Sequence, residues 1–121
     1  MVHVGDRALS LDNFFVLLYK DKEISLDTQT VEKVDVNFNF LQRFSSNKLI
    51  YGINTGFGPM AQYKVNEKNL LQLQYNLIRS HSSGGGNLMS PIMVKAVMIA
   101  RLNSLMQAYS GVHPEVVELL K

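Results

Sequence analysis

The first third of the chain shows two patterns of apolar and polar side chains, one with the period of a strand and one with the period of a helix. Residues 2–4 and 23–26 alternate as short strands do. Between them, Ser10 has the side chain of a helix N-cap, and apolar residues follow it at i, i+3, i+4 and i+7. This pattern predicts a helix that ends near residues 20–22.

Helical spacing returns twice in the middle of the chain. Asp27 is placed to cap a helix that ends near residues 45–47. Its predicted buried face carries Val31, Val34, Phe38 and Leu41. Asn66 is placed to cap another helix, which runs into the loop at residues 82–86. Between these two helices, three glycines and a proline in residues 52–59 exclude regular helix.

The last predicted helices begin at proline residues. Ser90 and Pro91 form a serine N-cap with proline at the first helical position, and we expect Gly111 to stop this helix after about Tyr109. The helix is apolar almost all round, so we expect more chain or other subunits to cover it. A final helix begins near Pro114 and has no stop signal, so the sequence looks truncated within it. The fold class predicted is mainly α, with short strands near the N-terminus.

Composition narrows the possible functions. Twelve basic and ten acidic residues among 121 give a net charge of +2, which favours neither nucleic acid nor an anionic membrane as a partner. The chain has no cysteine, which excludes disulfides and thiolate metal sites. Without a secretory signal or an apolar stretch long enough to span a membrane, we expect a cytoplasmic protein.

The segment from Gly52 to Gly58 is the first candidate for chemistry. It is not a P-loop, because no Gly-Lys-Ser/Thr follows it. It is not a dinucleotide-binding fingerprint either, because its glycines do not have the required spacing. A tight structural turn explains it, and so does a ligand-binding loop. Tyr51 beside it either packs its ring or acts as a base. A free phenol titrates near pH 10, so a base needs N–H groups, a helix N-terminus or a cation nearby to stabilise the phenolate.

The second candidate is Ser80 with His81, just before Gly84–Gly86. A histidine at a helix C-terminus is favoured by the helix dipole alone. We predict no metal site, because no second histidine stands at ligand spacing, and no hydrolase serine elbow is present. His113 precedes Pro114 and is expected to serve the start of the last helix.

Three ordered blocks together resemble one family, the aromatic amino acid ammonia-lyases and related aminomutases. Residues 51–58 read YGINTGFG, residues 73–81 read LQYNLIRSH, and the third block comprises RLNSL at 101–105 with SGVHPEV at 110–116. The resemblance implies that residues 1–121 are the N-terminal portion of a larger helical-bundle lyase that forms a homotetramer. It also implies a methylidene-imidazolone (MIO) electrophile made from an internal Ala-Ser-Gly, which these residues do not contain.

The resemblance also implies roles for single residues. Tyr51 matches the base that takes the β-proton of the amino acid substrate, on a lid loop formed by Gly52, Asn54, Gly56, Phe57 and Gly58. Ser80 and His81 match the substrate-selectivity pair and look like those of histidine ammonia-lyase, which converts L-histidine to urocanate. The alternatives are a tyrosine ammonia-lyase giving coumarate, an aminomutase, or a non-enzymatic helical module for assembly or ligand binding. The fragment alone is expected to be inactive.

Overall fold

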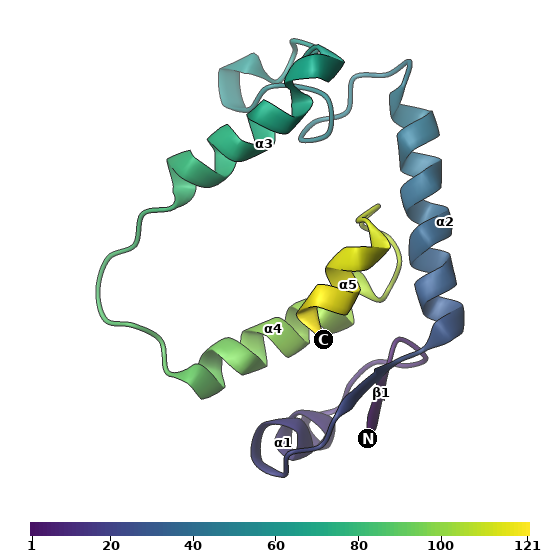
Figure 1. Cartoon of the computed structure of the whole chain (residues 1–121), viewed down its shortest axis with the longest axis vertical. Coiled ribbons are helices and arrows are strands. Elements are labelled where there is room, and N and C mark those ends of the chain that lie inside the picture. The colour runs from purple at the N-terminus through teal and green to yellow at the C-terminus, as the bar shows by residue number, and fades with distance from the viewer. The chain divides into compact units, whose positions relative to one another are not determined.

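The computed structural model confirms a mainly α chain with two short strands (Figure 1). It describes the backbone of residues 1–121 and every side chain except that of Glu67. The elements in chain order are β1 (Val2–Val4), α1 (Leu11–Tyr19), β2 (Ile24–Leu26), α2 (Thr28–Ser45), the 3₁₀ turn η1 (Gly58–Met60), α3 (Glu67–His81), α4 (Pro91–Leu105) and α5 (Pro114–Leu120). They form two compact units: a first unit of residues 1–41 and 88–121, and a second unit of residues 42–87.

The helix starts follow from local capping. Ser10 and Asn13 make a reciprocal capping box at the start of α1, as the predicted N-cap requires. The Asp27 carboxylate accepts hydrogen bonds from both the backbone N–H (2.9 Å) and the hydroxyl (2.6 Å) of Thr30. Asn66 caps α3 by accepting from the backbone N–H of Lys68. The helices α1, α2 and α3 therefore begin directly after the capping residues predicted from the sequence.

The core of the first unit forms where the strands meet the C-terminal helices. β1 and β2 pair in parallel, with Val2 opposite Ile24 and Val4 opposite Leu26. α4 packs against α1 and α5, and Figure 1 shows α5 alongside α4. The main buried cluster comprises Val4, Leu102, Leu105, Met106 and Val117. Segments from the two ends of the chain, Val4 and Val117 among them, thus share one apolar interior.

The prediction for α4 was wrong at its C-terminal end. The helix ends at Leu105 and not near Tyr109, and Gly111 is not its stop. Ala108 has a φ of +60°, and its N–H bonds back only three residues, to the Leu105 carbonyl, at 3.0 Å. This left-handed conformation breaks the i to i−4 ladder before Gly111 is reached. Ser90 occupies the N-cap position as expected, but its side chain makes no capping hydrogen bond.

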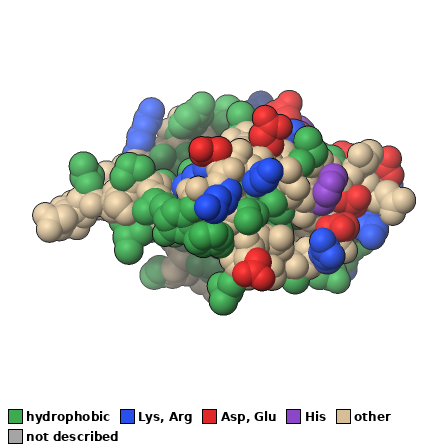
Figure 2. Space-filling view, turned by 90° about the horizontal axis from the view of Figure 1, so that it is seen from below, with side chains coloured by type: hydrophobic (Ala, Val, Ile, Leu, Met, Phe, Trp, Pro, Cys, Tyr) green, Lys and Arg blue, Asp and Glu red, His purple; other side chains and the backbone are tan. Residues whose placement is uncertain are grey.

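Helix α4 carries apolar side chains on almost every side, and several of them lie at the surface. Met93 and Val97 are each 58% exposed, while Ile99 and Leu102 are buried. Figure 2 shows hydrophobic side chains lying at the surface among charged ones. The side-chain oxygen Oδ1 of Asn103 is buried without a hydrogen-bond partner among the described residues. The expectation that further chain or other subunits cover this helix stays a prediction.

Candidate active-site loop

Tyr51 stands at the corner of a tight turn in the second unit. The backbone N–H of Ile53 donates to the carbonyl of Ile50 at 3.1 Å, which closes the turn over Tyr51 and Gly52. Gly52 has a φ of +76°, the value that a type II turn requires at its third residue and that favours glycine. The turn directs Tyr51 outwards, with 65% of the residue exposed. Its ring and that of Phe57 make a T-shaped contact, with 5.9 Å between the centroids.

Asn54 is the buried residue that follows this turn. Its amide nitrogen Nδ2 donates to the carbonyls of Ser45 at 2.8 Å and Lys48 at 2.7 Å. Its oxygen Oδ1 accepts from the backbone N–H of Ile50 at 2.8 Å. Only 6% of the residue is exposed. The resemblance implies that Asn54 is a lid residue, and this role stays a prediction. In the structure its side chain attaches the loop to the segment before it.

The second half of the loop is attached to the segment that leads into α3. Thr55 forms an isolated antiparallel bridge with Lys64, and the N–H of Val65 donates to the Asn54 carbonyl at 2.9 Å. Thr55 is 1% exposed. A Cβ at Gly56 would lie 2.6 Å from the Cβ of Met60, so the chain passes too closely there for any larger residue. Thr55 was missed as an anchor because a threonine between Asn54 and Gly56 carries no sign of burial in the sequence.

Two lysines flank the loop, and each is engaged locally. The Lys64 Nζ donates to the carbonyl of Ser46 at 3.2 Å. The Lys48 Nζ lies 3.8 Å from the centre of the Phe44 ring, at cation–π distance. Both therefore place positive charge on the segments that hold the turn.

Ser80 and His81 lie at the opposite end of α3. The Nδ1 of His81 is 2.9 Å from the carbonyl oxygen of Leu77, and Ser80 Oγ donates to the same oxygen at 3.0 Å. The Nδ1 also lies 3.0 Å from Ser80 Oγ, so the donor and acceptor roles at this nitrogen depend on the tautomer. In the tautomer that donates from Nδ1 to the Leu77 carbonyl, Nε2 is an acceptor. Both residues are exposed.

The chain does not bring the two predicted groups together. Figure 1 shows the loop gathered at the N-terminal end of α3, where Val65 is bonded to Asn54. His81 ends the helix, and 15 helical residues span about 20 Å. The loop residues from Tyr51 to Gly58 form one local structure, and Ser80 with His81 forms another.

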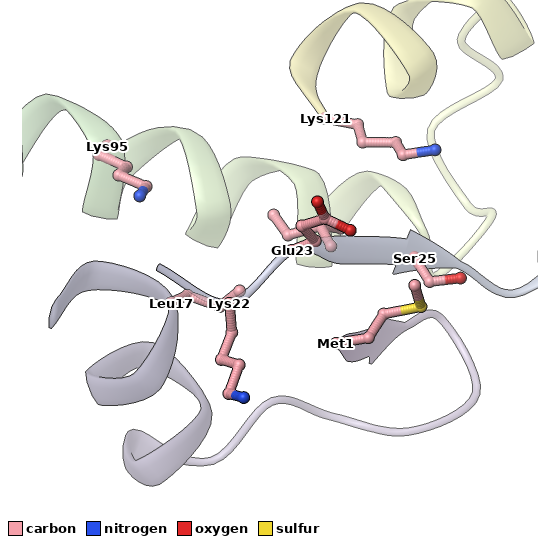
Figure 3. Close-up of a pocket in the computed structure, with 8 residues that line it drawn as sticks. Met1, Leu17, Lys22, Glu23, Ser25, Lys95 and Lys121 are labelled. Atoms are coloured by element: carbon pink, nitrogen blue, oxygen red, sulfur yellow. The ribbon is translucent and has the colours of Figure 1, made fainter. Parts of the chain in front are cut away.

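A pocket in the first unit is a separate candidate. It has a volume of 460 Å³ and is lined in part by Lys22, Glu23, Lys95 and Lys121. In Figure 3 the side chains of Lys22 and Lys121 extend in different directions and do not converge on one point. The described side chains include no group of three metal-ligating residues. No helix in the described part of the chain is long and apolar enough to cross a membrane.

Comparisons with known proteins agree with this architecture. The chain is 34% identical over 121 residues to a probable histidine ammonia-lyase of Thermoplasma volcanium, covering 99% of the chain and 24% of that protein. It is 39% identical over 113 residues to a tyrosine 2,3-aminomutase of Chondromyces crocatus, covering 93% and 21%. A crystal structure of tyrosine aminomutase from Streptomyces globisporus superposes with a TM-score of 0.88 at 30% identity, covering 98% of this chain and 23% of that one.

The chain therefore spans about a quarter of the length of the curated relatives it matches. A sequence profile described as aromatic amino acid lyase matches residues 9–121, which is nearly the whole chain. The three sequence blocks, the helical architecture and this match lead to one conclusion: the chain belongs to the aromatic amino acid lyase family.

Proposed function

We propose that residues 1–121 are the N-terminal portion of a longer protein that eliminates ammonia from an aromatic amino acid. We propose L-histidine as the substrate and urocanate as the other product. The observation that carries the proposal is the position of Tyr51, which is exposed at the corner of a turn whose other residues are held in place. A fixed backbone limits the positions from which an exposed phenol can reach a substrate.

The step assigned to this chain is one proton transfer. The Oη of Tyr51, as the phenolate, takes a proton from the β-carbon of the substrate. The C–H electron pair forms the new carbon–carbon double bond as the carbon–nitrogen bond breaks, and the nitrogen leaves with that bond's electrons as ammonia.

The cofactor proposed for the full-length protein is the methylidene-imidazolone ring, which supplies an electrophile that makes the amine a leaving group. Its precursor Ala-Ser-Gly does not occur in these 121 residues. We therefore assign no residue of this chain to hold it. A homotetramer is likewise proposed only for the full-length protein.

The substrate assignment depends on Ser80 and His81. In the tautomer with its proton on Nδ1, His81 offers Nε2 as an acceptor, and the imidazole N–H of a histidine substrate is a suitable donor. The phenol O–H of tyrosine could donate to the same atom. The 39% identity to a tyrosine 2,3-aminomutase makes tyrosine the second candidate substrate, with coumarate or a β-amino acid as product.

The test is made on the purified full-length protein. Turnover is followed by the ultraviolet absorbance of urocanate from histidine and of coumarate from tyrosine, with released ammonia measured in parallel. We expect Tyr51→Phe to lower kcat by about 10²–10⁴-fold, the usual contribution of a general base, while the cofactor ring still forms. Tyr63→Phe is the matched control, because Tyr63 is also exposed and lies in the same unit.

Each outcome has a defined meaning. Near-normal turnover by Tyr51→Phe would remove Tyr51 as the base. If a full-length protein that contains the ring released no ammonia and formed no β-amino acid from either substrate, the enzymatic proposal would fail. The non-enzymatic helical module would then be the better description.

A further inference from the structure

Asn54 uses the full hydrogen-bonding capacity of its amide nitrogen inside the loop. Both Nδ2 hydrogens are donated to backbone carbonyls, of Ser45 and Lys48, and Oδ1 accepts from the backbone N–H of Ile50. All three distances lie between 2.7 and 2.8 Å, which are strong values for amide hydrogen bonds. One buried side chain thus satisfies three backbone groups on the segment that leads into the turn.

These bonds tie together the two ends of the turn that carries Tyr51. The backbone N–H of Asn54 donates to the carbonyl of Ile50 at 3.2 Å, while the N–H of Ile50 donates to the Asn54 side chain. Ile50 and Asn54 therefore exchange two hydrogen bonds across the intervening residues. The Asn54 carbonyl accepts from Val65, so the same residue also connects the turn to the start of α3.

The chemistry of this site selects asparagine. Two donors and one acceptor are needed within one planar group, and a primary amide supplies them. A carboxylate would place an oxygen against the Ser45 and Lys48 carbonyls, where nothing remains to donate. Alanine would leave the Lys48 carbonyl and the Ile50 N–H without this partner, and the Ser45 carbonyl with the 3.4 Å bond from the Lys48 N–H, in a position nearly closed to water; this is costly.

Tyr51 depends on this arrangement because its side chain has little packing of its own. It is 65% exposed, and its ring contacts that of Phe57 edge-on. The backbone turn is therefore the main determinant of where the phenol Oη stands. We propose that Asn54 is a positioning residue for the proposed base Tyr51, acting through the turn from Ile50 to Asn54; this inference rests on the proposed function.

The test is a double-mutant cycle in the full-length protein. Asn54→Ala is introduced into the wild-type and into the Tyr51→Phe background, and kcat and KM are measured with enough enzyme to quantify residual rates. Displacing a catalytic group by about 1 Å can cost about 100-fold, so we expect that loss in kcat with little change in KM. In the Tyr51→Phe background the same substitution should cost only a few-fold, because the group that it positions is already gone.

Controls separate positioning from general damage. Asn39→Ala removes an exposed asparagine whose side chain bonds only to Asp35, and it should leave kcat unchanged. Hydrogen–deuterium exchange should quicken in residues 45–65 of the Asn54→Ala protein and stay unchanged elsewhere. If Asn54→Ala does not fold, Asn54→Ser, which keeps one hydroxyl, takes its place in the cycle. Asn54→Asp keeps the acceptor and loses both donors, so it should be at least as inactive as Asn54→Ala.

The outcomes also separate this inference from the proposed function. Normal turnover by Tyr51→Phe alone would overturn the proposed base, whatever Asn54 does. A loss in Tyr51→Phe with wild-type kcat in Asn54→Ala or Asn54→Asp would overturn the positioning role alone. Equal losses from the Asn54 substitution in both backgrounds would show a merely structural residue and would also overturn it.

Discussion

The core of the first unit gives a quantitative prediction. Leu102 is fully buried on α4, among Val4, Met106 and Val117. Leu102→Ala removes three carbons, which at about 0.8 kcal/mol each amounts to roughly 2.4 kcal/mol of lost burial. The cavity left behind adds to this cost, although the flexible Met106 side chain can fill part of it. We therefore expect the substitution to destabilise the first unit by about 3 kcal/mol.

The assay is hydrogen exchange by NMR on the 121-residue chain. It follows the amides of Val2 and Asp27, which are bonded to the carbonyls of Glu23 and Val4 between the strands. A loss of about 3 kcal/mol in the free energy of opening corresponds to exchange roughly 150-fold faster.

Val97→Ala is the matched control for this measurement. It lies on the same helix and is 58% exposed, so it should change exchange less than about 3-fold. Similar effects from the two variants would refute the argument. Wild-type amides that show no protection at all would refute it as well, because the core would then not hold the unit closed.

Two further predictions concern local conformation. Gly111→Ala should destabilise the first unit by about 1–3 kcal/mol in the same exchange assay, because its φ is +61° and the new Cβ would overlap Leu41. The control is Gly84→Ala, where a new Cβ meets open space and should have no effect. Equal effects from the two substitutions would contradict the reasoning. The pKa of the Asp27 carboxyl is lowered below its ordinary 3.8, chiefly by the hydrogen bond from the Thr30 hydroxyl and secondly by the one from the Thr30 N–H. The stability this adds is present above that value and lost as the pH falls through the lowered pKa. NMR titration should find a low pKa that rises in Thr30→Val, and an ordinary pKa in the wild type would refute this.

The starts of the helices could be predicted from the sequence because capping is local. Ser10, Asp27 and Asn66 each bond to a backbone N–H two or three residues ahead, so the residues that decide the outcome are neighbours in the chain. The strands were also predicted, but their parallel pairing was not. That pairing joins residues 22 positions apart, as between Val2 and Ile24, and local periodicity carries no information about it.

The end of α4 shows the opposite case. The sequence offers Gly111 as a stop, yet the helix ends at Leu105, and Ala108, which has no special signal for a positive φ, adopts one just beyond it. Gly111 instead donates its N–H to the side chain of Asn37 at 2.7 Å, a contact across 74 residues. A tertiary contact of this kind overrides a local preference, and a reading of neighbouring residues cannot anticipate it.

For the candidate site, the sequence by itself determined which residues are chemically suited to act. It singled out a phenol beside glycines and a serine–histidine pair at a helix end. Only the tertiary structure decided that Asn54 and Thr55 are buried anchors and that Tyr51, which precedes them, is exposed. The physical reason is that the hydrogen bonds of Asn54 reach back as far as Ser45, nine residues away, and such a closure depends on how the whole segment folds.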